Sequence, residues 1–476
     1  MKKSEIKIYP GLLLLGVSGL ISTNCGAETP AAPAISNAWQ KPSWLTDMSL
    51  GVKEGFDDNV LLVADQNPGM KAQSSWITTV SPKVGFNFAP LLGNQKTLQT
   101  LSLAYSPDFA IYHGASSESY NAHKLAAGIK GKSGDFSFSL DNAFLFNDGS
   151  SVAPIYALDQ SAVAANQADK NRSAYATAIA RERREQIQDR ASIVMQYNID
   201  KFFIRPSAAL LYYDLMTDQH RASVAPFKGY QNYVDRYDIN GGLDFGYKVT
   251  PDISAILGYR YGHQYQQAMP NAVDTMVVNG QQAHASADYQ RVLGGLEGKP
   301  LKWLTAKLAA GPEFRSYCSA APVDNDHTVD YYGEAALTAT ITPTQTLSVN
   351  YKHWQWVSST GKLVYGDNTY SLAYHWNATK QLGLDLGVKY VESDYNSSSA
   401  RLTGRTATAA GQSQRDDAMC TFSLGVGYAF TPHLSASLAY NYDLGRNLQD
   451  NLPVSAYADY REFDHQLVSA GVQFKF

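Results

Sequence analysis

Apolar and polar side chains alternate along most of this chain with a period of two residues. The alternation is clearest at Tyr233–Lys248, where Ile239, Leu243 and Phe245 fall on one side and Asp238 and Asp244 on the other. Successive side chains of a β-strand point to opposite faces of the sheet. The alternation therefore predicts strands that have one apolar face and one polar face.

The same pattern returns about eighteen times between residues 47 and 476, in stretches of roughly ten to sixteen residues. Short connectors such as Thr250–Asp252 and Thr431–His433 alternate with long ones such as 148–182 and 394–414. Strands of this length, joined by turns on one side and loops on the other, are typical of a transmembrane barrel. The fold class that we predict is all-β, a transmembrane antiparallel up-and-down β-barrel of about eighteen strands.

The composition agrees with this fold class. Charged residues make up 17% of the chain, below the roughly 25% of soluble domains. The mean hydropathy of −0.28 excludes a bundle of membrane helices. The net charge of −4 gives no basic excess, so no nucleic-acid partner is expected.

The N-terminus has the features of a secretory signal. Lys2, Lys3 and Lys7 precede an apolar run at Gly11–Ser22, and small residues follow as far as Ala27. We assign residues 1–27 to a signal peptide, 28–46 to a Pro- and Ala-rich periplasmic leader, and 47–476 to the barrel. The alternative, a lipoprotein anchor on Cys25, fits the preceding residues badly. Cys318 and Cys420 remain, and we expect two single thiols.

The last strand carries a resemblance. In Leu467–Phe476 the apolar residues Val468, Val472, Phe474 and Phe476 share one face, and the chain stops on an aromatic residue. This resembles the closing strand of the outer-membrane β-barrels of Gram-negative bacteria. The resemblance implies that Phe474 and Phe476 form an assembly signal read by the barrel-insertion machinery. It also implies location in the cell outer membrane. An even number of strands then predicts that both termini lie in the periplasm.

A second resemblance lies at the other end of the barrel. Gly51–Val60 is similar to the opening strand of a loosely defined family of outer-membrane β-barrel porins. Some members are similar to barrels encoded with exopolysaccharide systems. A stack of soluble β domains would also show two-faced strands. The absence of linkers after residue 46 and of any repeat period speaks against that alternative.

The polar faces predict a charged lumen. A barrel of about eighteen strands is too wide for side chains to fill, so water remains inside. Both a mild anion preference and a merely hydrated wall of paired charges fit this set. The residues that we expect to line the pore are Lys53, Lys83, Asp108, Lys130, Asp141, Arg190, Arg205, Arg236, Asp238, Asp244, Arg260, Lys307, Glu313, Arg315, Asp330, Glu334, Lys352, Asp385, Lys389 and Asp443.

The insertion at 148–182, with the arginines that follow it, is a candidate constriction. By analogy with classical porins, this loop would fold into the lumen and narrow it. An extracellular loop outside the lumen is the alternative. The residues that would face the pore are Asp159, Asp169, Lys170, Arg172, Arg181, Arg183 and Arg184.

No cofactor, metal or catalytic residue is expected. Asp57, Asp58 and Asn59 offer oxygens for calcium, but consecutive residues of a strand do not converge on one ion, and turn chemistry explains them. The histidines are scattered, and no Gly-x-Ser-x-Gly motif is present.

The function that the sequence favours is a passive outer-membrane channel, not an enzyme. Its expected partners are outer-membrane lipid, the insertion machinery and small hydrophilic solutes; the oligomeric state stays open. The alternative function is a conduit for polysaccharide export or uptake. A hydrolase embedded in the barrel is the less favoured third function.

Overall fold

The structure is a computed structural model of the 476-residue chain. It describes residues 41–60, 62, 72–93, 96–148, 186–216, 235–268, 277–278, 281–282, 284–321, 325–357, 364–394, 416–448 and 462–476. The proposed signal peptide and most of the leader lie outside these residues.

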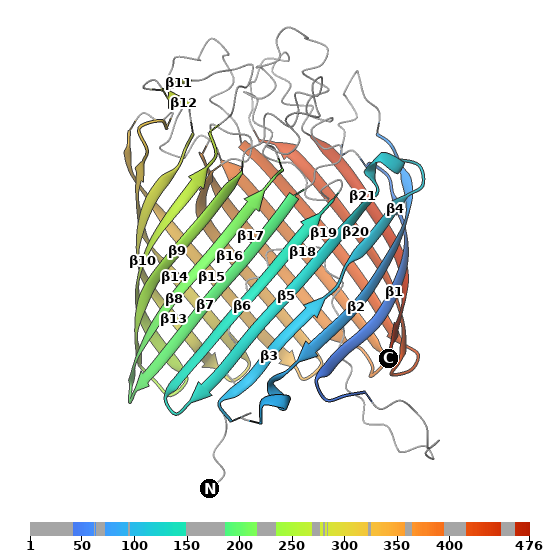
Figure 1. The fold of residues 1–476 in the computed structure, drawn as a ribbon, viewed down its shortest axis with the longest axis horizontal. Helices are drawn as coiled ribbons and strands as arrows, with labels where there is room; N and C mark the ends of the chain where they lie inside the picture. Colours follow the sequence, from blue (N-terminus) through green and yellow to red (C-terminus); the bar gives the residue numbers. More distant parts are fainter. Residues whose placement is uncertain are drawn as a thin grey trace.

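One sheet closes on itself and forms the whole body of the molecule (Figure 1). Every strand pairs antiparallel with its neighbours in chain order, and β1 pairs with β21 to close the ring. β3 and β4 are two halves of one strand, since both pair with β2 and with β5. The wall thus has eighteen strands, which confirms the predicted closed transmembrane antiparallel β-barrel.

The bounds of the strands follow the alternating stretches of the sequence closely. In the first half they are β1 (Leu45–Asp57), β2 (Ser75–Asn87), β3 (Leu98–Tyr105), β4 (Asp108–Tyr112), β5 (Tyr120–Ser133), β6 (Phe136–Asn147), β7 (Gln186–Ile199), β8 (Phe202–Asp214), β9 (Arg236–Lys248) and β10 (Ile253–Gln266). In the second half they are β13 (Ala287–Leu301), β14 (Leu304–Tyr317), β15 (His327–Thr342), β16 (Gln345–Val357), β17 (Val364–Asn377), β18 (Leu382–Asp394), β19 (Asp416–Ala429), β20 (Leu434–Asn447) and β21 (Phe463–Lys475).

Three features depart from a regular series of strands. The stretch 98–112 is divided into β3 and β4 at Pro107, whose ring nitrogen has no hydrogen to donate to a ladder. A small pair, β11 (Val277–Val278) and β12 (Gln281–Gln282), lies outside the barrel sheet. The 3-10 turns η1 (Ala89–Leu92) and η2 (Ser116–Glu118) sit beside β2 and β4. No helix of the described residues is long and apolar enough to cross a membrane.

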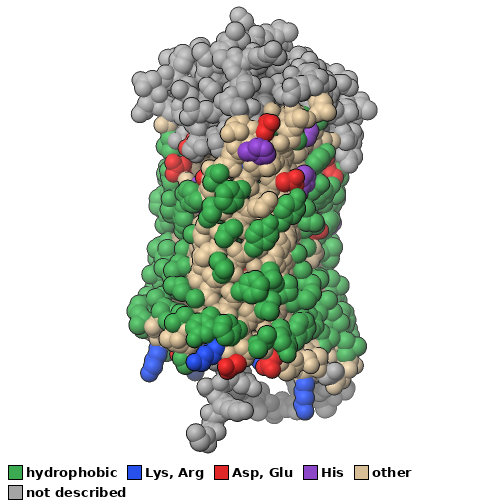
Figure 2. All heavy atoms as spheres, turned by 90° about the vertical axis from the view of Figure 1, so that its left-hand side faces the viewer, with side chains coloured by type: hydrophobic (Ala, Val, Ile, Leu, Met, Phe, Trp, Pro, Cys, Tyr) green, Lys and Arg blue, Asp and Glu red, His purple; other side chains and the backbone are tan. Residues whose placement is uncertain are grey.

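The outer face of the wall is apolar. Phe56, Trp76 and Val468 occupy paired positions on β1, β2 and β21, with exposed fractions of 36%, 55% and 44%. Figure 2 shows hydrophobic side chains spread over one side of the barrel, with charged side chains gathered toward its two ends. An apolar belt of this kind suits the hydrocarbon layer of a membrane, because lipid chains cannot solvate charged groups.

Exposed aromatic rings mark the end of the barrel with the short turns. Phe202 packs on Tyr247 with ring centroids 5.0 Å apart, and Tyr428 lies equally close to Phe430. Phe474 and Phe476 meet edge to face at 4.8 Å, and the Phe476 N–H donates to the Met48 carbonyl across the seam. Amphipathic rings at this level fit an interfacial girdle.

Candidate pore and its constriction

All twenty predicted pore residues lie on the face of the wall opposite the apolar belt. The cross-strand register fixes this, because residues that pair directly across a ladder share a face. They lie on β1 (Lys53), β2 (Lys83), β4 (Asp108), β5 (Lys130), β6 (Asp141), β7 (Arg190), β8 (Arg205), β9 (Arg236, Asp238, Asp244), β10 (Arg260), β14 (Lys307, Glu313, Arg315), β15 (Asp330, Glu334), β16 (Lys352), β18 (Asp385, Lys389) and β20 (Asp443).

The inner face of β13 was not predicted, and it completes the charged surface. The alternation around Arg291 has no clear phase in the sequence. In the structure Arg291 pairs with Arg260 and with Glu313, so its side chain faces the lumen, as do those of Tyr289 and Glu297. Gly262 makes room for this face: a Cβ there would lie 2.3 Å from the Tyr289 ring.

A carboxylate between two arginines is the centre of one side of the lumen. Glu313 accepts from Arg291, and from Arg315 Nε at 2.5 Å. The Glu313 and Arg315 side chains have no exposed surface, and Arg291 keeps only 8%. Arg291 also stacks on the rings of Tyr289 and Tyr332, each at 4.3 Å. A buried carboxylate held in this way makes the three charges depend on one another.

A second group of paired charges lies nearer the short turns. Arg205 Nε donates to Asp244 at 3.0 Å, and both of its terminal nitrogens donate to Glu297. Arg260 contacts the other oxygen of Asp244 at 2.6 Å. Lys307 and Glu334 form a further pair at 2.9 Å. Each of these cations has a carboxylate within bonding distance, so the wall here carries little net charge.

The C-terminal part of β16 leaves the barrel wall. Its ladder with β15 ends at the pair Gly333–His353, although β16 continues to Val357. Pairing with β17 does not stop there, since Trp354 faces Asp367 and Val357 faces Val364. We call the segments Trp354–Val357 and Val364–Asp367 the inner hairpin.

The inner hairpin is bonded to strands that are distant in the sheet. β10 and β16 are four places apart, a separation of roughly 19 Å along a flat sheet. Yet the Gln355 carbonyl accepts from Gln264 of β10 at 3.0 Å and from Arg315 of β14 at 2.9 Å. The Val357 carbonyl accepts from Arg236 of β9 at 2.6 Å. All three donors are on inner faces, so the hairpin must bend into the lumen.

Asp330 of β15 accepts hydrogen bonds at the level where β16 no longer pairs with β15. Its Oδ1 accepts from the Tyr331 N–H at 2.8 Å, and its other oxygen accepts from the Gln355 side chain. A strand edge that loses its neighbour exposes backbone donors. Here a side-chain carboxylate satisfies one of them.

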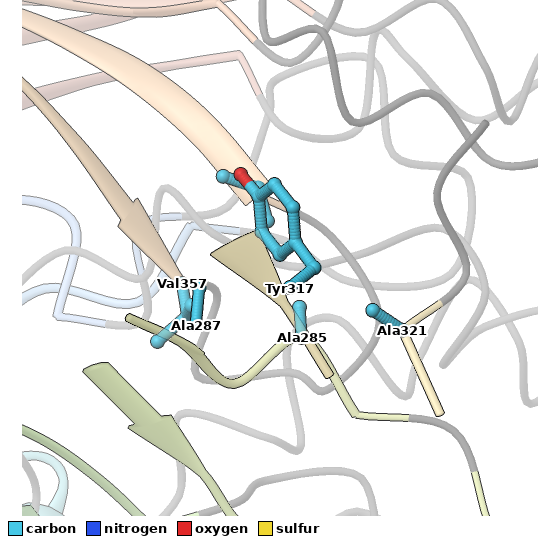
Figure 3. Packing of buried hydrophobic residues seen from close by; sticks show 6 residues of the cluster. Ala285, Ala287, Tyr317, Ala321 and Val357 are labelled. Carbon is cyan, nitrogen blue, oxygen red and sulfur yellow. The ribbon is translucent and has the colours of Figure 1, made fainter. Parts of the chain in front are cut away.

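An apolar cluster holds the end of the inner hairpin. Val357, Val364 and Ala287 are end residues of β16, β17 and β13, and they form one buried cluster with Ala285 and Tyr317. Figure 3 shows Val357 close to the two alanines and Tyr317. Val357 and Ala285 have no exposed surface. The hairpin thus rests on a small core inside the barrel. In a regular eighteen-stranded wall this space would hold water.

The opposite side of the lumen is more exposed. Lys83 pairs with Asp47 at 2.6 Å and Lys130 with Asp141 at 3.6 Å, with side chains between 25% and 38% exposed. Lys124 pairs with Asp108. His375 contacts Asp385 at 2.6 Å. Water reaches these pairs, so each is screened.

The closing seam has its own polar contact. His465 of β21 lies 3.2 Å from Asp57 of β1 and 2.9 Å from Asp443 of β20. Because both ring nitrogens contact carboxylates, neither is available to activate a hydroxyl nucleophile. The arrangement joins the first and last strands. Asp58 and Asn59, considered above as calcium ligands, instead bond to Gln466 and Asp464 of β21.

Two further sequence predictions concern the constriction residues and the cysteines. The candidate constriction residues Asp159, Asp169, Lys170, Arg172, Arg181, Arg183 and Arg184 lie outside the described residues. The described cysteines, Cys318 and Cys420, are free thiols. Within the described ranges, no group of three or more His, Cys, Asp or Glu side chains is placed to hold a metal ion.

Comparisons with known proteins return barrels only at low similarity. No protein-family model matches the chain, and no curated protein matches it significantly. Among solved structures, OpdK of Pseudomonas aeruginosa with vanillate matches at 10% identity and a TM-score of 0.40, covering 90% of this chain and 98% of that one. The outer-membrane expressed OmpT of Vibrio cholerae matches at 14% identity and a TM-score of 0.34, covering 92% and 99%. The ferric citrate transporter FecA matches at 10% and 0.38, covering 91% and 79%. At these scores the likeness carries no argument about function.

Proposed function

We propose that this protein is an outer-membrane channel through which small hydrophilic solutes diffuse passively. One observation carries the proposal: a closed eighteen-stranded wall that is apolar outside and lined by charged side chains inside. Backbone groups in hydrocarbon must be paired, and closure of the sheet pairs them. A charged, partly exposed inner face needs water, which implies an aqueous path.

The same proposal covers targeting and assembly. Residues 1–27 would direct export and be removed, and 28–46 would lie in the periplasm with both termini. Phe474 and Phe476 would be the signal that the insertion machinery reads, and their exposed rings beside the seam with β1 support this role. Deleting Phe476 should leave the chain unassembled in the periplasm. Normal insertion of that truncation would contradict this part of the proposal.

The polysaccharide conduit receives less support. A sugar path needs aromatic rings exposed along the lumen. Tyr289, Tyr317 and Tyr332 face inward but are only 1%, 7% and 9% exposed, because they pack against arginines and the inner hairpin. They form part of the protein core and offer little surface on which a sugar ring could stack.

Liposome swelling tests the proposal. Liposomes that contain the purified barrel should swell in arabinose and glucose, with rates that fall steeply for larger sugars such as stachyose. Empty liposomes are the control. Exclusion of glucose, or equal rates for all sugars up to long oligosaccharides, would contradict a narrow passive channel.

A further inference from the structure

A series of cations and aromatic rings in contact runs from the inner face of β7 to the inner hairpin. Arg190 of β7 donates to the Tyr213 hydroxyl at 2.9 Å. The guanidinium of Arg236 lies 5.1 Å from the Tyr213 ring and 5.2 Å from the Trp356 ring. Trp356 stacks on Trp354 at 4.9 Å. Lys352 Nζ then lies 4.0 Å over Trp354.

The partners of these cations set them apart from several other lumen cations. Arg205, Arg260, Arg291 and Lys307 each contact a carboxylate within 4 Å. Within the described part of the chain, Arg190, Arg236, Lys352 and Lys389 have no ion pair at that distance. Three of them contact ring faces or a phenol instead. A ring stabilises a cation through its quadrupole and leaves the net charge in place.

The donors of the cluster are not used up. Arg236 Nη1 bonds the Val357 carbonyl, but its Nε is buried and has no hydrogen-bond partner. Arg190 makes one described hydrogen bond, through Nη2. A guanidinium carries five N–H donors in a planar fork that matches an oxyanion. Because Arg236 Nε is buried, the unused donors that a solute can reach include those of the partly exposed Arg190, and these are suited to an anionic group.

Lys389 brings a further positive charge from the opposite wall. It lies on β18, nine places from β7 in the ring of strands. Even so, Lys389 and Arg190 are near enough to interact electrostatically. Asp367 and Asp443 also act on Lys389. Asp367 is engaged by Trp354 and Ser393, and Asp443 by Thr421 and His465. Lys389 therefore brings a second cation toward Arg190 from the other side of the narrowed lumen, with Asp367 and Asp443 beside it.

We propose that Arg190, Arg236 and Lys389 form a binding station for a carboxylate-bearing solute inside the channel. This inference rests on the proposed function, since it names the class of solute that the channel passes. The station lies where the inner hairpin narrows the lumen, so that a solute must pass close to the free donors. Local positive potential raises the concentration of anions there, and the guanidinium groups orient the carboxylate.

The test uses glutarate, a small dicarboxylate, on the full-length barrel in planar bilayers. Added glutarate should reduce the chloride current with a saturating dose dependence. In Arg190→Gln and in Lys389→Gln the half-blocking concentration should rise about tenfold, as expected for loss of a charge-assisted contact. Arg190→Lys should recover part of the block. Under a KCl gradient the wild type should select anions, and the double variant should lose that selectivity.

Lys302→Gln is the matched control. It removes one positive charge from the exposed short turn between β13 and β14, away from the lumen. Its block by glutarate should equal that of the wild type. A conducting channel that glutarate does not block, or blocks equally in every variant, overturns the binding station and leaves the channel function standing.

A silent bilayer would overturn the channel function instead. The station is then decided by calorimetric titration of the detergent-solubilised barrel with glutarate. Binding that weakens in Arg190→Gln and not in Lys302→Gln supports it. Absence of binding, or equal binding in both, overturns it.

Discussion

Charged side chains are buried in one part of the barrel wall and partly exposed in another. In the packed sector, the inner faces of β9, β10 and β13–β16, arginines and carboxylates are buried against each other and against the inner hairpin. In the open sector, the inner faces of β18–β21 and β1–β6, ion pairs such as Lys83–Asp47 stay partly exposed. One ring of strands therefore holds a core on one side and a hydrated surface on the other.

The packed sector should depend strongly on single buried charges. Glu313→Gln leaves Arg291 and Arg315 without their shared carboxylate, at a cost of about 3–5 kcal/mol. Asp47→Asn in the open sector, where the pair with Lys83 is 30–37% exposed, should cost about 1 kcal/mol or less. Thermal unfolding in detergent compares the two variants. Equal losses would remove the distinction between the sectors.

The inner hairpin should depend on its buried tryptophan. Trp356 is 2% exposed, so Trp356→Ala should destabilise the barrel by about 3 kcal/mol. It should also widen the path, because the hairpin loses the ring that Arg236 contacts, and single-channel conductance should rise. Trp303→Ala is the control, since Trp303 lies on the outer belt with 51% exposure. An unchanged conductance in Trp356→Ala would mean that the hairpin does not narrow the pore.

The seam is the one part of the open sector expected to behave like the packed sector. His465→Gln removes contacts to Asp57 and Asp443, at a cost of about 2 kcal/mol. His375→Gln, which loses contact with the single carboxylate Asp385, should cost less. Unfolding midpoints in detergent rank the two. A smaller loss for His465 than for His375 would show that the seam contact contributes little.

The smallest effect concerns titration next to the apolar cluster. Burial lowers the pKa of His284 and raises that of Cys318. A lowered histidine pKa means that stability falls as the pH drops below about 6.5, where the unfolded imidazole binds its proton first. The raised thiol pKa predicts slow maleimide labelling of Cys318 that accelerates only above about pH 9. Fast labelling at pH 7 would contradict the burial of this thiol.

Part of this architecture could be predicted from the sequence, because local alternation fixes which face a side chain takes. The alternation puts Arg236, Asp238 and Asp244 on one polar face, and the register of β9 with β10 puts all three on the same side of the wall. Arg291 could not be assigned, since Gly294 and Gly295 interrupt the alternation beside it. Its face follows from pairing with β10 and β14.

The inner hairpin could not be predicted, because its sequence alternates like that of any wall strand. Trp354 and Trp356 have the spacing of a strand face whether β16 stays in the wall or leaves it. Hydrogen bonds from Gln264, Arg315 and Arg236 hold the hairpin in the lumen, and these residues are remote from it in sequence. The cation–aromatic series depends on the same contacts. It therefore appears only once the barrel is closed.

The decisive measurement is the current through single molecules of the purified barrel in a planar bilayer. A charged inner face within an apolar wall predicts a steady open state, with a conductance that rises with salt concentration. A bilayer that stays silent at high protein load, while the protein is folded and inserted, would contradict a water-filled path through the barrel.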